Sequence, residues 1–155
     1  MNRHFGFFDL ETAKDLFRKL EHDLVALRES GQNSWDAFNF FVTAEHLLEW
    51  LKVPGGPRTY KDKHLLLQVV SHIANGAKHF QIADSSHKSV KSTVVETYFN
   101  KGSSEPPYFE DGYMQQCLLV HLEANEAKEL GSPIAVWDLG TKVVEFFKRE
   151  FPELQ

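Results

Sequence analysis

Residues 33–52, which read NSWDAFNFFVTAEHLLEWLK, decide the fold class of this chain. Asn33 or Ser34 can cap a helix here, because a short polar side chain accepts a hydrogen bond from a free backbone N–H group. One broad face of that helix is apolar, with Ala37, Phe40, Phe41, Ala44, Leu47, Leu48 and Leu51. The opposite face adds Trp35, Phe38, Val42 and Trp50. A helix that is apolar nearly all round is buried nearly all round, so we expect a central helix or one that also packs on a second subunit.

Amphipathic helices are predicted on both sides of this segment. Apolar residues recur at steps of three and four over residues 9–30, and Gly31 follows where a helix end favours glycine. The cluster Pro54-Gly55-Gly56-Pro57 forces a turn after the central helix. A third helix is expected over residues 61–80, and its core stripe is Leu66, Val69, Val70, Ile73, Ala77 and Phe80.

The chain after Phe80 changes character. Residues 91–98 are rich in Val and Thr and predict a strand, and residues 116–123 predict a second one. We expect an exposed loop over 100–112, a hairpin connection over 124–131 and a third strand over 133–137. Asp138 can cap a last helix, which turns Leu139, Val143, Phe146, Phe147 and Phe151 inward.

The predicted fold class is therefore mainly α within the α+β class, with a small antiparallel sheet inserted before the last helix. A length of 155 residues suits a single domain over 1–155. The only cysteine, Cys117, excludes an intramolecular disulfide and a Cys-rich zinc site. Neither a signal peptide nor a spanning run of about 20 apolar residues is visible, so we expect a cytoplasmic protein without membrane contact.

Charge is uneven along the chain. The net charge is −5, which argues against a strongly basic nucleic-acid binder. Residues 58–101 nevertheless hold seven cations and three anions, a local balance of +4. Such a segment can form an anion-binding surface, or it can be a solvated face with scattered lysines. The sequence leaves both interpretations open.

The third helix carries a row of polar side chains beside its core stripe. Gln68, His72, Asn75 and His79 lie within about 60° of one another on a helix. Gly76 lies in the same stretch and costs about 1 kcal/mol relative to alanine inside a helix, which suggests a close approach by another helix or a ligand. We therefore take this row as the candidate site, with Gln68 and Asn75 as ligand-binding residues.

Two segments resemble the HEPN superfamily, the helical nucleotide-binding domain of prokaryotes and higher eukaryotes. They are His72-Ile-Ala-Asn-Gly-Ala-Lys-His79-Phe80 and the stretch from Ala37 to Trp50. The resemblance implies a four-helix up-and-down bundle, usually dimeric, with a cleft at the dimer interface lined by the third helix. Active members are metal-independent ribonucleases whose signature is an arginine followed, after four to six residues, by a histidine. His79 matches that histidine, whereas positions 72 to 74 hold His, Ile and Ala instead of arginine.

Cleavage of RNA without a metal needs a base, an acid and a cation on the phosphate. His79 would be the base, His72 the acid and Lys78 the phosphate contact. Along one helix the two histidines are separated by about 10.5 Å, so a single phosphorus would require two copies crossing in a homodimer. The alternative is that His79 is hydrogen-bonded inside the bundle, with Asn39, His46 or Glu49 as its partner.

Two functions follow from these patterns. The missing arginine favours a non-catalytic interaction module that binds a protein partner. The local positive charge favours a metal-independent ribonuclease or nucleotide-binding component of a toxin or defence system. No two histidines stand at the i, i+4 spacing of a zincin and no phosphate-binding glycine loop is present, so neither a metal nor a cofactor is predicted.

Overall fold

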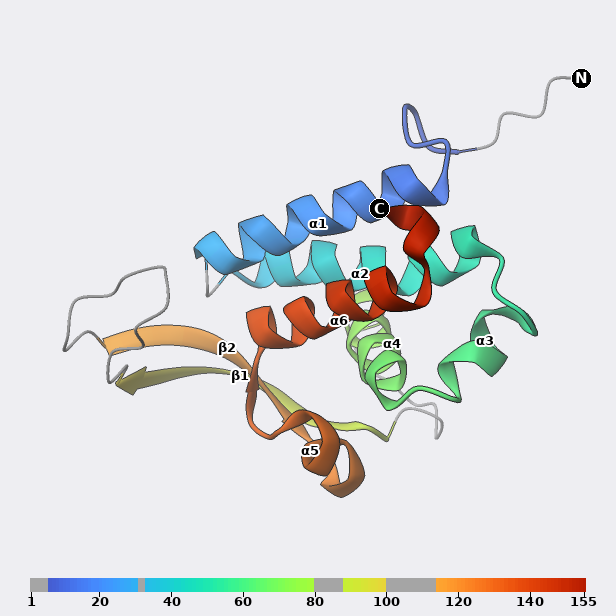
Figure 1. Cartoon of the computed structure of the whole chain (residues 1–155). Coiled ribbons are helices and arrows are strands. Elements are labelled where there is room, and N and C mark those ends of the chain that lie inside the picture. The colour runs from blue at the N-terminus through green and yellow to red at the C-terminus, as the bar shows by residue number, and fades with distance from the viewer. Residues whose placement is uncertain (1–5, 31–32, 80–87, 100–113) are drawn as a thin grey trace, which may run out of the picture.

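The structure, a computed structural model, describes residues 6–30, 33–79, 88–99 and 114–155. Four longer helices are α1 (Ala13–Ser30), α2 (Ser34–Leu51), α4 (Leu65–Lys78) and α6 (Val136–Glu150). The shorter elements are α3 (Gly56–Lys61), α5 (Ala124–Leu130) and the 3-10 turn η1 (Pro152–Leu154). The strands are β1 (Val90–Phe99), β2 (Met114–Leu122) and β3 (Ile134–Ala135). The expectation of a mainly helical α+β chain with a small antiparallel sheet before the last helix is confirmed (Figure 1).

The caps set the helix boundaries. Asn33 Oδ1 accepts a hydrogen bond from the Trp35 N–H at 2.9 Å, which confirms the predicted cap of α2. The first helix starts later than the predicted residue 9. Thr12 lies just before it and Asp15 in its first turn, and the side chain of each accepts a hydrogen bond from the backbone N–H of the other, which caps the helix. The hydroxyl of Thr12 is also the main cause that lowers the pKa of the Asp15 carboxyl. The predicted cap at Gly31, the end of the third helix at Phe80 and the loop over 100–112 lie outside the described residues.

The predicted third helix is present as α4, but it starts at Leu65 instead of residue 61, because the chain breaks between α3 and α4. His64 has extended backbone angles, φ −132° and ψ 109°, and its ring packs 4.9 Å from that of Tyr60 and 5.0 Å from that of Phe146. These contacts with α3 and α6 turn the chain at His64. Residues before the break form α3, which starts at Gly56 with Pro57 in its first turn.

The predictions for the C-terminal third need two corrections. Residues 124–131 connect the antiparallel strands β2 and β3, as the predicted hairpin connection requires, but residues 124–130 form the helix α5. The run ANEAKEL contains good helix formers, and Gly131 ends it at φ +88°. The third strand covers only Ile134–Ala135, since α6 begins at Val136, before Asp138. Asp138 lies in the first turn of α6, where a carboxylate interacts favourably with the helix dipole.

The sheet has the order β1-β2-β3 with antiparallel neighbours. Val95 lies opposite Leu118 and Thr93 opposite Val120, so these side chains share one face of the sheet. Leu118, Val120 and Leu122 are buried in the same core as the helices. The sheet therefore packs one face against the helical layer, beside α4 and α6 (Figure 1).

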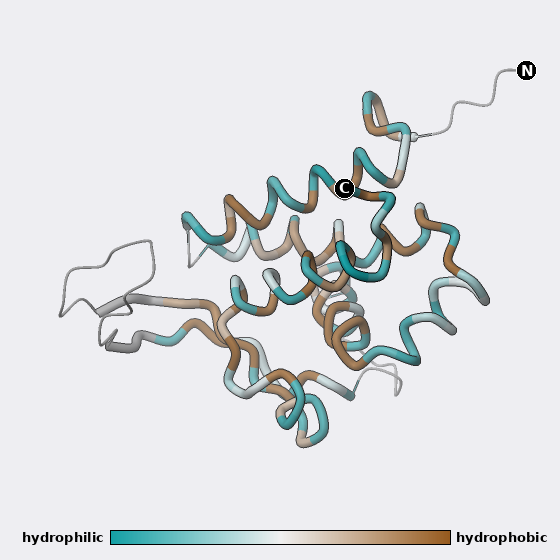
Figure 2. The backbone as a smooth tube through the Cα atoms, viewed as in Figure 1, coloured by the Kyte–Doolittle hydropathy of each residue, from teal (hydrophilic) through white to brown (hydrophobic). Residues whose placement is uncertain are grey.

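The core is formed where α1, α2, α4 and α6 meet, and hydrophobic stretches alternate with hydrophilic ones along these helices (Figure 2). All five apolar residues predicted to point inward from the last helix are buried: Leu139, Val143, Phe146, Phe147 and Phe151. α2 is a central helix in contact with α1, α4 and α6, but within one chain it is not buried nearly all round, and the alternative that it also packs on a second subunit stays a prediction. Trp35 is 80% exposed and Phe38 is 45% exposed, because in the described residues nothing covers this end of the helix.

Candidate binding groove

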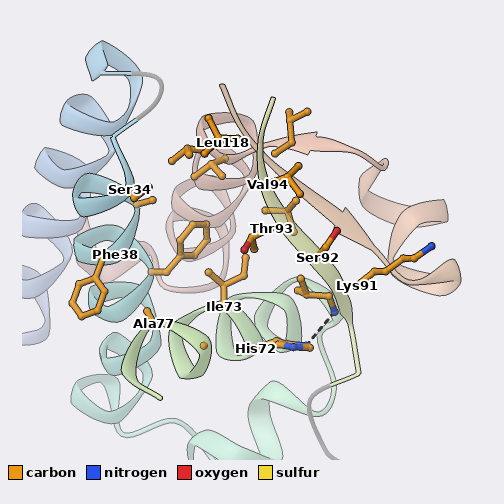
Figure 3. Close-up of a pocket in the computed structure, with 18 residues that line it drawn as sticks. Ser34, Phe38, His72, Ile73, Ala77, Lys91, Ser92, Thr93, Val94 and Leu118 are labelled. Carbon is orange, nitrogen blue, oxygen red and sulfur yellow. Dashed lines mark hydrogen bonds between the residues drawn. The ribbon is translucent and has the colours of Figure 1, made fainter. Parts of the chain in front are cut away.

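An open groove lies between the first half of α2, the second half of α4 and the sheet (Figure 3). Its volume is about 600 Å³, which lies within the range of ligand sites. Phe41 of α2, Ile73 of α4 and Leu118 and Val120 of β2 contribute apolar surface from three different elements. Backbone and side chains of residues 90–95 of β1 line the remaining side. The groove is therefore a composite of helices and sheet that no single segment of the sequence shows.

The rim of the groove carries apolar side chains in solvent. Phe38 of α2 lines the groove and is 45% exposed, and Val95 of β1 lines it at 57% exposure. Trp35 stands one helical turn before Phe38 and is 80% exposed. Trp35 does not line the groove, so Phe38 and Val95 are the large apolar side chains of its lining that are exposed to solvent among the described residues. Single exposed apolar residues are ordinary, but such residues on the rim of an apolar groove favour an interaction site.

His72 connects α4 to the start of β1. Its ring nitrogen Nδ1 accepts a hydrogen bond from the Val90 N–H at 3.1 Å (Figure 3). A backbone N–H can only donate, so Nδ1 must carry a free lone pair, which a protonated ring nitrogen lacks. The side chain thus holds the sheet against the helix at one edge of the groove.

The other members of the predicted polar row do not reach this groove. Gln68 donates from Nε2 to the carbonyl of Asp62 at 3.0 Å, and Asn75 donates from Nδ2 to the carbonyl of Ser71 at 2.7 Å. Lys78 is the last residue of α4, and His79 follows as its C-cap; both are exposed. Among the five predicted site residues of α4, His72 alone lines the groove.

The prediction that residues of the second helix hold His79 inside the bundle is wrong. His79 is exposed, and His46 instead pairs with Glu49 of its own helix at 3.3 Å. Asn39 is exposed, and its backbone carbonyl accepts from the hydroxyl of Thr43. His79 is exposed because α4 ends at Lys78 and His79 is only its C-cap. This position lies at the end of α4, beyond the part of the helix that packs on α2.

A buried polar cluster joins α2, α3 and α4 instead. Lys61 Nζ lies 2.5 Å from Glu45 Oε1, and Ser71 Oγ lies 3.2 Å from both atoms. The Glu45 side chain is 10% exposed, and its second oxygen has no hydrogen-bond partner among the described residues. Sequence reasoning missed this cluster, although a carboxylate within an otherwise apolar stretch of α2 was its one visible signal.

Cys117 lies inside the protein, as a strand position predicts. It is 0% exposed, and burial, with smaller contributions from Glu96 and Asp138, raises the pKa of its thiol to about 11. The thiolate is the reactive form, so this cysteine is protonated at neutral pH and is not a nucleophile.

The described residues show no group of three or more His, Cys, Asp or Glu side chains placed to share a metal ion. In the same part of the chain, none of the helices combines the length and the apolar character needed to cross a membrane. Comparison with protein-family models, with curated proteins and with solved structures finds no match to this chain.

The hydrogen bond between His72 and Val90 gives a first prediction. His72→Phe keeps a ring of similar size but removes the acceptor, so we expect the free energy of unfolding to fall by about 1–3 kcal/mol. Urea denaturation measures the loss, and hydrogen exchange at the Val90 amide should accelerate. His72→Asn places an oxygen acceptor near the position of Nδ1 and should recover part of the stability. Equal stability of wild type and His72→Phe would contradict this role.

Proposed function

We propose that this chain is a non-catalytic interaction module that binds a segment of another protein in the groove between α2, α4 and the sheet. The observation that carries the proposal is the open apolar groove with exposed Phe38 and Val95 in its lining. Burying such side chains against a partner removes apolar surface from water, which is the main favourable term in association.

The placement of the predicted catalytic groups supports a binding role. His72 lines the groove, but its Nδ1 is engaged by the backbone of β1. His79 and Lys78 are exposed at the end of α4, and neither lines the groove. An acid–base pair needs two groups within reach of one reacting atom, and the groove residues offer no second titratable group besides Lys91.

We also propose that the chain is a divergent HEPN-like domain. The support is its element order, in which three of the longer helices precede the sheet and α6 follows it. The four-helix up-and-down bundle and the homodimer that this kinship implies are part of the proposal. A homodimer formed through α4 would give a solution mass of two chains.

The groove predicts a binding experiment. Selection from a random peptide library against the whole chain should enrich peptides whose affinity falls by about tenfold or more in Phe38→Asp, because a charge replaces an apolar contact. Val25→Asp is the matched control, since Val25 is also an exposed apolar residue, at 54%, but belongs to α1 and does not line the groove. Peptides that bind wild type and both variants equally would contradict the proposed function.

A metal-independent ribonuclease, acting as a toxin or defence component, is the second candidate. One observation favours it, namely that Lys78 and His79 are both exposed side by side at the end of α4. We expect wild type and His79→Ala to cleave single-stranded RNA at the same background rate, because the predicted acid, His72, is bonded to the Val90 N–H and lines the groove, which His79 does not line. Cleavage by wild type that the substitution abolishes would replace the interaction module with the ribonuclease.

A further inference from the structure

The outer edge of β1 is the feature that defines what the groove can hold. In the described residues β1 pairs with β2 alone, so it is an edge strand. Lys91, Ser92, Thr93, Val95 and Glu96 are all exposed. Successive side chains of a strand point to opposite faces, so exposure at consecutive positions means that neither face of this stretch is well covered. An open edge strand is a template for pairing with another chain.

The hydrogen bonds at the start of β1 show which way this edge faces. The Ser89 carbonyl accepts from the Glu123 N–H just after β2, so Ser89 points its polar groups toward β2. The next residue, Val90, donates its N–H to His72 of α4 instead. Successive residues of a strand direct their backbone groups to opposite sides, so the outer edge of β1 faces α4 at this point. His72 already occupies the place that the first carbonyl of an added strand would take.

The dimensions of the groove suit an extended segment. Six consecutive residues of β1, from Val90 to Val95, line it, and an extended strand of that length spans about 20 Å. Across from β1, Phe38, Ile73 and Ala77 line the groove (Figure 3). A strand laid along β1 would send every second side chain toward this apolar surface.

Lys91 gives the lining of the groove a positive charge. Among the residues that the structure describes, Lys91 is the only charged one that lines the groove, and no carboxylate does. Lys78 and Lys88 are exposed one and two residues from lining residues of α4 and β1, at the end of the groove where β1 starts. Carboxylates flank the lining elsewhere, where Asp36 precedes a lining residue of α2 and Glu96 follows one of β1. An incoming segment with a carboxylate near Lys91 meets a complementary charge, whereas a basic segment is repelled.

We propose that the groove binds an extended acidic segment of a partner protein, which adds to the sheet as a strand beside β1. Alternate apolar side chains of that segment enter the groove between α2 and α4, and an Asp or Glu of the segment lies near Lys91. This inference rests on the proposed function, because it names the class of partner for the same groove. Backbone hydrogen bonds to β1 supply affinity, and the apolar side chains supply specificity.

Amide methylation of a selected peptide tests the strand geometry without altering the protein. A strand turns only alternate N–H groups toward its neighbour, so N-methylation at every second position should weaken binding by about tenfold or more and leave the positions between little affected. The selected peptides should carry apolar residues at alternate positions and an acidic residue. Lys91→Glu should weaken their binding by about fivefold, while Lys142→Glu on the exposed face of α6 should not.

The outcomes separate this inference from the function on which it rests. Peptides that need Phe38 but have apolar residues at helical spacing, or tolerate methylation at every position, overturn the added strand and leave the interaction module intact. Failure to select any peptide that distinguishes wild type from Phe38→Asp overturns both. A solution mass of two chains that drops to one when Val94 is replaced by Pro would also overturn the inference, because a second copy would then occupy the edge of β1.

Discussion

Lys61→Met lowers the free energy of unfolding by about 3–5 kcal/mol, because it leaves the carboxylate of Glu45 buried without its cation. The Glu45 side chain is 10% exposed, the Lys61 side chain 19%, and the two charged atoms lie 2.5 Å apart. Ser71 remains as a neutral donor to Glu45, which replaces only part of the lost interaction. Methionine matches the lysine stem in length, so the loss reports the charge more than the packing.

Two further variants test whether the loss of stability in Lys61→Met comes from the unpaired charge of Glu45. Lys63→Met removes an exposed lysine two residues away and should change the unfolding free energy by only about 0.5 kcal/mol. The double variant Glu45→Leu with Lys61→Met should recover most of the loss, since a buried ion pair is often replaced by apolar residues at little net change. Urea denaturation of the set measures these differences. A loss in the double variant as large as that in Lys61→Met alone would contradict the charge explanation.

Phe40→Ala is the second substitution with a large expected effect, again a loss of about 3–5 kcal/mol in the free energy of unfolding. The Phe40 ring is 0% exposed and packs edge to face with Phe41 at 5.3 Å. The ring also packs against α6 at Gly140. A Cβ added to that glycine would lie only 3.3 Å from the Phe40 ring. Truncation therefore leaves a cavity between two helices that surrounding side chains cannot fill without moving α6.

Phe38→Ala provides a matched control on the same helix. Phe38 is 45% exposed at the groove, so its truncation should cost about 1 kcal/mol or less in stability. The two substitutions should therefore separate stability from binding, with Phe40→Ala unfolding early in urea and Phe38→Ala remaining folded but weakened toward selected peptides. Similar losses of stability in both variants would show that the groove side of α2 is covered in solution.

The candidate site was only partly predictable from the sequence. The row on the third helix identified His72, which lines the groove and binds Val90, eighteen residues away in the chain. The same row suggested Gln68, Asn75 and His79, whose side chains bond elsewhere or are exposed. Spacing along a helix places side chains on a common face, but it does not say what lies opposite that face. The β1 edge, which completes the groove, comes from a distant segment.

The sequence by itself determined the types of the four longer helices and the two longer strands, and most of the core. Periodicity and capping are local properties, so they predicted α2 with its Asn33 cap and the five inward residues of α6. Tertiary structure alone decided where the chain breaks at His64, which carboxylate is buried beside Lys61, and which end of α2 stays open. These features depend on the packing of segments far apart in the chain, and apolar patterning cannot distinguish a face buried by the protein's own core from one left for a partner.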